Sequence, residues 1–272
     1  LDGGYILASG AQRVRIEGNT VRNWTSTDPN RSPIFLTNVQ NARISRNTLD
    51  GTTFAAAVTN GRGLLSLVGV TDAEVVGNII TGSATGHGIG CRDCTRVAIR
   101  GGLIRDNLGS GIQFYLTNTD VTVDGVSIID NNTSNNGFRA GIHFSGHATD
   151  GSTTRGVVQN STIISPAADK QAAPFRLDVA NVTLTNNVLT PRQASNAITT
   201  SGTVTLNTTS ELAAAPTAQT IAAGNTVSAD ACGGIKRISS AGSVTTDTTN
   251  TFTAPGITNQ GCVMFVCNSG AN

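Results

Sequence analysis

One segment of this chain recurs seven times as an alternating apolar stretch that closes on Gly or Asn and one further apolar residue. The copies are VRIEGNTV from Val14, ARISRNTL from Ala42, AEVVGNII from Ala73, VAIRGGLI from Val97, VTVDGVSI from Val121, GVVQNSTI from Gly156 and VTLTNNVL from Val182. Aligned at Asn19, Asn47, Asn78, Gly102, Val126, Asn160 and Asn187, they lie 24 to 34 residues apart. Because a single strand cannot bury its own apolar face, strand-like repeats of this length predict a stacked solenoid.

A second set of strand-like segments lies upstream of the first, one for each copy. These segments are YILAS from Tyr5, PIFLT from Pro33, LLSLV from Leu64, GIGCRD from Gly88, GIQFYL from Gly111, GIHFSG from Gly141 and PFRLDV from Pro174. Alternation with period two turns Ile112, Phe114, Ile142 and Phe144 to one face, which we expect to point inward. Short strands repeated in one direction predict an all-β parallel β-helix of about seven to eight turns, over residues 1–210.

The two strand sets resemble the right-handed single-stranded β-helix that pectate lyases, polygalacturonases and phage tailspikes share, and the right hand is implied by this resemblance. Residues 211–272 are rich in Thr, Ala and Gly with frequent turn signals, which predicts a small antiparallel, sandwich-like cap. A β-helix followed by a small all-β terminal domain, here ending in GCVMFVCNSGAN, resembles phage tailspikes. That resemblance implies a homotrimer on the virion tail or outside the cell, which recognises and cleaves bacterial surface polysaccharide.

The amino-acid composition argues against two classes of function, nucleic-acid binding and membrane insertion. Charged residues make up 13% of the chain, against roughly a quarter in ordinary soluble proteins, and the formal net charge is +1. This charge gives no electrostatic reason to expect nucleic acid as a partner. No apolar run is long enough to predict membrane insertion. Because the first residue is Leu1 and not Met, we expect the chain to be the downstream part of a longer protein.

The outward residues of the second strand set form the patch that is richest in functional groups. Any solvent-facing sheet carries polar residues, but this patch gathers scarce ones, since the chain has three His and two Tyr. We expect Tyr115, His143, Asp93 and Asp178 to be catalytic, and Arg92, Gln113, Ser145 and Arg176 to bind substrate. On consecutive turns these side chains predict a polar row along the rod, which suits a polysaccharide.

Two reactions fit such a row. Lyase chemistry on a uronic acid needs a base beside the acidic proton and a cation for the carboxylate, which Tyr115 or His143 and Arg92 or Arg176 would supply. Glycoside hydrolysis needs two carboxyl groups about 5 to 9.5 Å apart. Asp93 and Asp178 are predicted about three turns apart, which is too far. Asp120 with Asp150, or a pair across a trimer interface, stay open as alternatives.

No metal or cofactor is expected. His143 and His147 lie four residues apart, which on a strand is roughly 13 Å and too far to share one ion. Cys91 and Cys94 form a lone CxxC, and we expect both thiols to be buried. Besides the tailspike, a non-catalytic glycan-binding adhesin or structural β-helix, or a secreted polysaccharide lyase unconnected with a virion, are the alternative functions.

Overall fold

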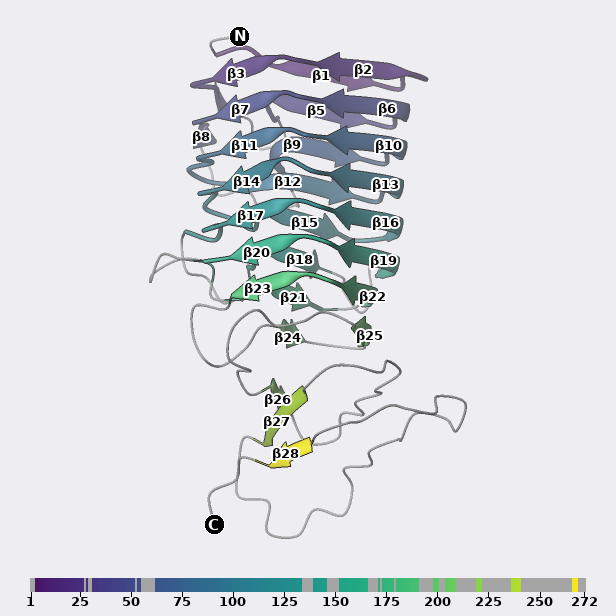
Figure 1. Cartoon of the computed structure of the whole chain (residues 1–272). Helices are drawn as coiled ribbons and strands as arrows, with labels where there is room; N and C mark the ends of the chain where they lie inside the picture. Colours follow the sequence, from purple (N-terminus) through teal and green to yellow (C-terminus); the bar gives the residue numbers. More distant parts are fainter. Residues whose placement is uncertain are drawn as a thin grey trace.

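Three short strands and the bends between them make up one turn of the chain, and the turns stack along a rod (Figure 1). The computed structural model describes residues 3–26, 28, 31–51, 53–54, 62–133, 139–145, 152–165, 171, 173–178 and 180–190, and beyond these only short strands. Within these residues, every pair of strands is parallel. The parallel β-helix expected from the repeats is therefore confirmed.

Three parallel sheets run the length of the rod. Sheet 1 contains β1 (Ile6–Ser9), β5 (Ile34–Thr37), β9 (Gly63–Val68), β12 (His87–Arg92), β15 (Ile112–Tyr115), β18 (Ile142–Ser145), β21 (Phe175–Leu177) and β24 (Ile198–Thr200). Sheet 2 contains β2 (Val14–Glu17), β6 (Gln40–Ser45), β10 (Thr71–Val76), β13 (Thr95–Arg100), β16 (Asn118–Asp124), β19 (Thr153–Gln159), β22 (Ala180–Thr185) and β25 (Val204–Thr208).

Sheet 3 closes each turn. It contains β3 (Thr20–Arg22), β7 (Thr48–Asp50), β11 (Ile79–Thr81), β14 (Leu103–Arg105), β17 (Ser127–Ile129), β20 (Thr162–Ile164) and β23 (Val188–Thr190). A further two-stranded sheet joins β4 (Thr25–Ser26) to β8 (Thr53–Phe54). The connections of variable length run from a strand of sheet 3 to the next strand of sheet 1, which accounts for the uneven repeat spacing.

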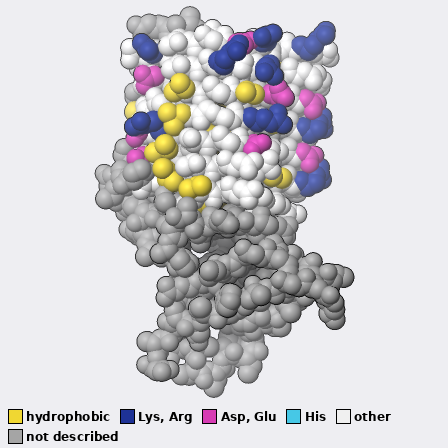
Figure 2. Space-filling view, in the orientation of Figure 1, with side chains coloured by type: hydrophobic (Ala, Val, Ile, Leu, Met, Phe, Trp, Pro, Cys, Tyr) yellow, Lys and Arg dark blue, Asp and Glu magenta, His cyan; other side chains and the backbone are white. Residues whose placement is uncertain are grey.

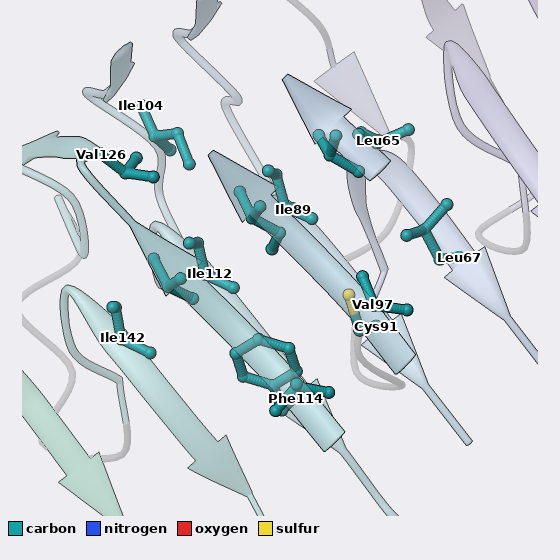
Figure 3. Close-up of a cluster of buried hydrophobic side chains, with 14 of the residues drawn as sticks. Leu65, Leu67, Ile89, Cys91, Val97, Ile104, Ile112, Phe114, Val126 and Ile142 are labelled. Carbon is teal, nitrogen blue, oxygen red and sulfur yellow. The ribbon is translucent and has the colours of Figure 1, made fainter. Parts of the chain in front are cut away.

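The interior of the rod is filled by the residues that alternation predicted to point inward. Cys91, Phe114 and Phe144 on sheet 1 are fully buried, and their side chains meet those of sheets 2 and 3. The rings of Phe114 and Phe144, on neighbouring turns, stack with their centres 4.8 Å apart. Figure 3 shows Val97 of sheet 2 beside Cys91 of sheet 1. Each turn thus buries its apolar face against the turns above and below.

The bend between sheets 2 and 3 carries a buried asparagine ladder. Oδ1 of Asn47 accepts hydrogen bonds from the main-chain N–H and the side-chain Nδ2 of Asn19, at 2.9 and 3.0 Å. Asn78 accepts the same two bonds from Asn47, at 2.9 and 3.0 Å. Since Asn47 is 1% exposed, these bonds satisfy polar groups that water cannot reach. The repeated asparagine is a structural residue.

The alignment of one repeat is corrected by this ladder. Ser161, not Asn160, takes the ladder position, because the Val126 N–H donates to Ser161 Oγ at 3.2 Å and the Ser161 N–H donates to Asn187 Oδ1 at 3.0 Å. Asn160 lies one residue earlier, at a φ of 51° that repeats such as the one at Gly18 fill with glycine. Adjacent Asn and Ser both suit this bend, so Asn160 was named as the aligned residue although the segment GVVQNSTI from Gly156 is itself in the correct frame.

The expected cap at 211–272 lies almost entirely outside the described residues, as does the expected boundary at residue 210. The strands described there are β26 (Gln219–Ile221), β27 (Lys236–Ser240) and β28 (Val266–Asn268). They pair in parallel, which differs from the antiparallel pairing expected from the sequence. In the part of the chain that the structure describes, no helix is long and apolar enough to cross a membrane.

Candidate functional site

The outer face of sheet 1 carries two parallel rows of side chains, set by strand register. The row through Gln113 contains Leu7, Phe35, Ser66, Gly90, Gln113, His143 and Arg176. The row through Tyr115 contains Ser9, Thr37, Val68, Arg92, Tyr115 and Ser145. Strand register therefore brings Gln113, His143 and Arg176 into one row and Arg92, Tyr115 and Ser145 into the other, while Asp93 and Asp178 belong to neither row.

The Gln113 row is more enclosed than the sequence suggested. Gln113 is 6% exposed and His143 is 4% exposed, although both point away from the core of the rod. Ser66, in the same row, is fully buried and its hydroxyl lies 2.7 Å from that of Ser32, which precedes β5. Segments that lead into the next strand thus cover part of this face. The expectation that the whole row faces solvent is wrong, because period-two alternation gives the face of a sheet and not what lies over it.

His143, Asp178 and Arg176 form a compact polar cluster on the last described turns of this face. Nε2 of His143 lies 2.9 Å from Oδ2 of Asp178, and Nε of Arg176 donates to Oδ1 of the same carboxylate at 2.9 Å. The Asp178 main-chain N–H donates to the Phe144 carbonyl at 2.9 Å, which fixes the residue on the turn next to His143. One carboxylate therefore holds a ring and a guanidinium in place.

Burial lowers the pKa of His143, and the hydrogen bond and charge of Asp178 oppose this effect in part. The ring is consequently neutral at pH 7, and with Asp178 ionised its proton lies on Nε2. Nδ1 is then an acceptor, and in the described residues it has no hydrogen-bond partner. The side-chain oxygen of Gln113, on the adjacent turn, is likewise buried without a hydrogen bond of normal geometry, although the Gln113 side chain interacts with His87 and partly opposes the lowering of that ring's pKa by burial. Two enclosed acceptors thus lie on neighbouring turns.

His87 is the first residue of β12 and was not among the predicted site residues, although the charge of His143 acts on it. Its Nδ1 accepts a hydrogen bond from the Ser110 N–H at 2.8 Å. Burial lowers the pKa of His87 to about 3, and the charges of Arg139 and His143 add to the effect. His87 is therefore neutral at any physiological pH, and it serves the packing of the turn.

The Tyr115 row is the accessible part of the site. The Arg92 guanidinium lies 5.8 Å from the centre of the Tyr115 ring, and Arg92 Nε is 3.4 Å from the Asp93 carboxylate. Arg92 and Asp93 side chains are 33% and 43% exposed, so both are open to a ligand. Ser145 pairs in register with Tyr115 on the next turn. A cation, an aromatic hydroxyl and an aliphatic hydroxyl are therefore presented in line.

The carboxyl groups of the site do not form a hydrolytic pair. Asp93 follows β12 and Asp178 follows β21, three turns away, which corresponds to roughly 14 Å. Asp120 lies at the corner of sheet 2, where it forms an ion pair with Arg155. Asp150 and His147 lie outside the described residues. The carboxyl groups predicted for the site, Asp93 and Asp178, therefore do not have the spacing of a glycosidase pair.

A pocket at the first turns of sheet 1 was missed by the sequence reasoning. It is lined by Tyr5, Leu7, Asp28, Arg31 and Phe35 and has a volume of about 220 Å³. The available signal was alternation: Leu7 and Phe35 are large apolar residues at outward positions of their strands. The sequence predicted the site toward the other end of the sheet, where Tyr115, His143 and Arg176 lie on neighbouring turns.

The described residues do not form a metal site. Among the described residues, no three His, Cys, Asp or Glu side chains lie together in a way that would hold an ion. Cys91 and Cys94 are free and buried, as expected. The pKa of the Cys91 thiol is raised well above its usual value, first by its hydrogen bond with Cys94 and then by burial. These thiols are packing residues of the interior.

A parallel β-solenoid with a polar row on one outer sheet defines the class of this protein. Residues 3–209 match a family model described as a right handed beta helix region, and the chain belongs to that family. No curated protein matches the chain. Among solved structures, ORF18 of Geobacillus virus E2 is similar, with 14% identity over 77% of this chain and a TM-score of 0.34. The chain spans about half, 51%, of that protein's chain, and so weak a likeness carries no argument about function.

Proposed function

We propose that this protein is the β-helix of a phage tailspike, which binds bacterial surface polysaccharide along the outer face of sheet 1 and cleaves it. The observation that carries the proposal is the run of cationic, aromatic and polar side chains over four successive turns of that face. These are Arg92 on β12, Tyr115 on β15, His143 and Ser145 on β18, and Arg176 and Asp178 on and after β21. Turns spaced about 4.8 Å apart present these groups to successive units of a polymer lying along the rod.

The tailspike assignment is supported by the order of parts in the sequence, a β-helix followed by a short all-β terminal segment. In this proposal the protein is a homotrimer on the virion tail, and its partner is the O-antigen or capsule of the host. A solenoid also needs its open end covered, which the terminal segment would do. Size measurement in solution tests this part separately, because a monomer would remove the support for a tailspike.

Lyase chemistry fits the accessible residues better than hydrolysis. In such a reaction a base takes the proton from the carbon beside a uronate carboxylate, and the bond to the leaving oxygen breaks as a double bond forms. Tyr115 is placed to exchange that proton, and Arg92 beside its ring is placed to hold the carboxylate. For glycoside hydrolysis, the two carboxyl groups next to this row, Asp93 and Asp178, lie too far apart.

His143 takes a positioning role in this proposal and not the role of the reacting base. Its ring is 4% exposed, so substrate reaches Asp178 and Arg176 before it reaches His143. The Asp178 carboxylate, held by Arg176 and His143, is a second candidate base at the open edge of the cluster. Gln113 and Ser145 contribute an amide and a hydroxyl for hydrogen bonds with sugar hydroxyls.

The test is incubation of the full chain with a panel of bacterial capsules and O-antigens. Release of new reducing ends together with the ultraviolet absorbance of an unsaturated sugar is the expected result. New reducing ends without that absorbance would identify a hydrolase and overturn the role given to Tyr115. Binding without any release would leave a non-catalytic glycan-binding protein, and no binding to any polysaccharide would contradict the proposed function as a whole.

A further inference from the structure

The pocket at the first turns of sheet 1 combines apolar surface with a partly free cation. Tyr5 and Leu7 are 47% and 51% exposed, and Phe35 and Arg31 line the pocket with them. Arg31 Nη1 donates to the Tyr5 hydroxyl at 2.7 Å, and Arg31 Nε donates to Asp28 at 3.3 Å. Within the described residues, Nη2 of Arg31 has no hydrogen-bond partner. The guanidinium is thus held in place from two sides while one edge stays available.

Arg62 supplies an independent sign that this region takes a negatively charged ligand. Its guanidinium lies 4.5 Å from the centre of the ring of Phe35, which lines the pocket. Arg62 is 8% exposed, and its Nε and Nη1 atoms are buried without a hydrogen-bond partner among the described residues. The charge of Asp28, which also pairs with Arg31, offsets only part of the cost of burying this cation. A nearby anion would offset that cost, and the lowered pKa of Arg62, caused by burial and then by Arg92, agrees with this need.

Arginine and aromatic rings recur together along this face. Arg31 lies over Tyr5, Arg62 over Phe35 and Arg92 over Tyr115, at 5.3, 4.5 and 5.8 Å from the ring centres. All three pairs involve residues on or next to strands of sheet 1. Aromatic rings pack against the apolar faces of sugar rings, and a fixed guanidinium binds a planar carboxylate through paired hydrogen bonds. The combination suits a sugar that carries a carboxylate.

We propose that the pocket lined by Tyr5, Leu7, Asp28, Arg31 and Phe35 binds one carboxylated sugar unit of an acidic polysaccharide, with the carboxylate on Arg31. This inference rests on the proposed function and names its substrate class. Its volume of about 220 Å³ is on the scale of a single sugar ring and not of a longer segment. Asp28 lies in the same pocket, so a singly charged carboxylate is favoured over a doubly charged phosphate, which that acid would repel.

The test compares the polysaccharides bound by the full chain before and after chemical reduction of their carboxylates to alcohols. Binding is expected to weaken by at least about tenfold after reduction and to weaken also with added salt. Arg31→Gln is expected to give a similar loss on the unreduced polymer and no further loss on the reduced one. The matched control is Arg43→Gln, which removes an arginine of similar exposure on sheet 2 and is expected to leave binding unchanged.

Arg62→Met gives a second variant, since it keeps a long apolar side chain over Phe35 while removing the charge. It is expected to weaken binding of the carboxylated polymer selectively, and Arg31→Gln keeps the test decisive if this variant does not fold. Binding that survives carboxyl reduction, or that Arg31→Gln leaves intact, would overturn the inference while the proposed function stands. Failure of the wild-type protein to bind any polysaccharide would instead remove the proposed function on which the inference rests.

Discussion

Sheets 1 and 2 share the same parallel stacking, yet their outer faces have opposite characters. On sheet 2 the charged residues pair with each other in the open: Arg43 Nη1 is 2.5 Å and Arg100 Nη1 is 3.2 Å from the Glu74 carboxylate. These side chains are 45% to 51% exposed. Figure 2 shows cationic and anionic side chains interspersed along this side of the rod. Because such charges are already paired and solvated, a ligand would gain little binding free energy by contacting them.

On the outer face of sheet 1, several polar atoms are buried from water and have no hydrogen-bond partner among the described residues. Gln113 and His143 each have a buried acceptor atom without a partner in the described residues. The Nε and Nη1 donors of Arg62 are also buried without a partner there. Each cation–π pair of the described residues also belongs to this face. Unsatisfied buried groups cost free energy, and they are expected where a ligand completes the hydrogen bonding. The hydroxyls of Ser45 and Thr153 on sheet 2 are also buried without a partner, but the unpaired cation and the cation–π pairs lie on sheet 1, which is why the proposed function places recognition there.

The largest expected effect is on cleavage. Tyr115→Phe removes the hydroxyl that exchanges the proton, and the rate of polysaccharide cleavage should fall by about 10² to 10⁴. Binding should change little, because the ring that packs against Arg92 remains. Thr122→Val, which removes a hydroxyl from the outer face of sheet 2, is the matched control and should leave the maximal rate unchanged. Initial rates over a range of polymer concentrations separate the two, and equal rates for Tyr115→Phe and the wild type would exclude Tyr115 as the base.

The next effect is on stability. Asp178→Asn leaves the nearly buried Arg176 and His143 without their shared carboxylate, and it should lower the free energy of unfolding by about 3 kcal/mol. Glu74→Gln removes an equally paired carboxylate on sheet 2, but in the open, and should cost less than about 1 kcal/mol. Urea unfolding followed by circular dichroism measures both. A similar decrease in the free energy of unfolding for the two variants would contradict the difference described between the outer faces of sheets 1 and 2.

A smaller effect is expected from acid. Burial lowers the pKa of His87 to about 3 in the folded chain, whereas a histidine in the unfolded chain has a pKa near 6.5. As the pH falls below about 6.5, His87 therefore binds a proton in the unfolded chain but not in the folded chain. The contribution of His87 to the free energy of unfolding is fully present above about pH 6.5. It decreases as the pH falls, by about 1 kcal/mol between pH 6.5 and 5.5. His143, whose pKa is also lowered, acts in the same direction. His87→Gln should flatten the decline of unfolding free energy over this range, and an unchanged slope would contradict the account.

The fold was predictable because it depends on patterns that repeat. Alternation identified Phe114 and Phe144 as interior residues, and recurrence of Asn19, Asn47 and Asn78 marked one bend. A second asparagine ladder was missed although LIRDN from Leu103 and SIIDN from Ser127 end on the same pair of letters. In that ladder the side-chain Nδ2 of Asn107 donates to Asn131 Oδ1 at 2.8 Å, on fully buried residues.

The site was predictable only in part. Register placed Gln113, His143 and Arg176 in one row, because the sequence period sets which residues lie side by side. Burial of that row was not predictable, since it depends on segments of irregular length that pass over the sheet. Arg62 escaped notice for the same reason: it lies in a connection, and its stacking on Phe35 follows from the path of that connection and not from any repeat.

The central claim is that ligand recognition belongs to the outer face of sheet 1. The most direct test measures the dissociation constant of a bound capsule or O-antigen for two double variants of equal charge change. Arg31→Gln with Arg92→Gln on sheet 1 should weaken binding by about 100-fold, from two charge-assisted contacts of about tenfold each. Arg43→Gln with Arg100→Gln on sheet 2 should stay within about twofold of the wild type. Equal losses for both pairs, or a loss confined to sheet 2, would contradict the account.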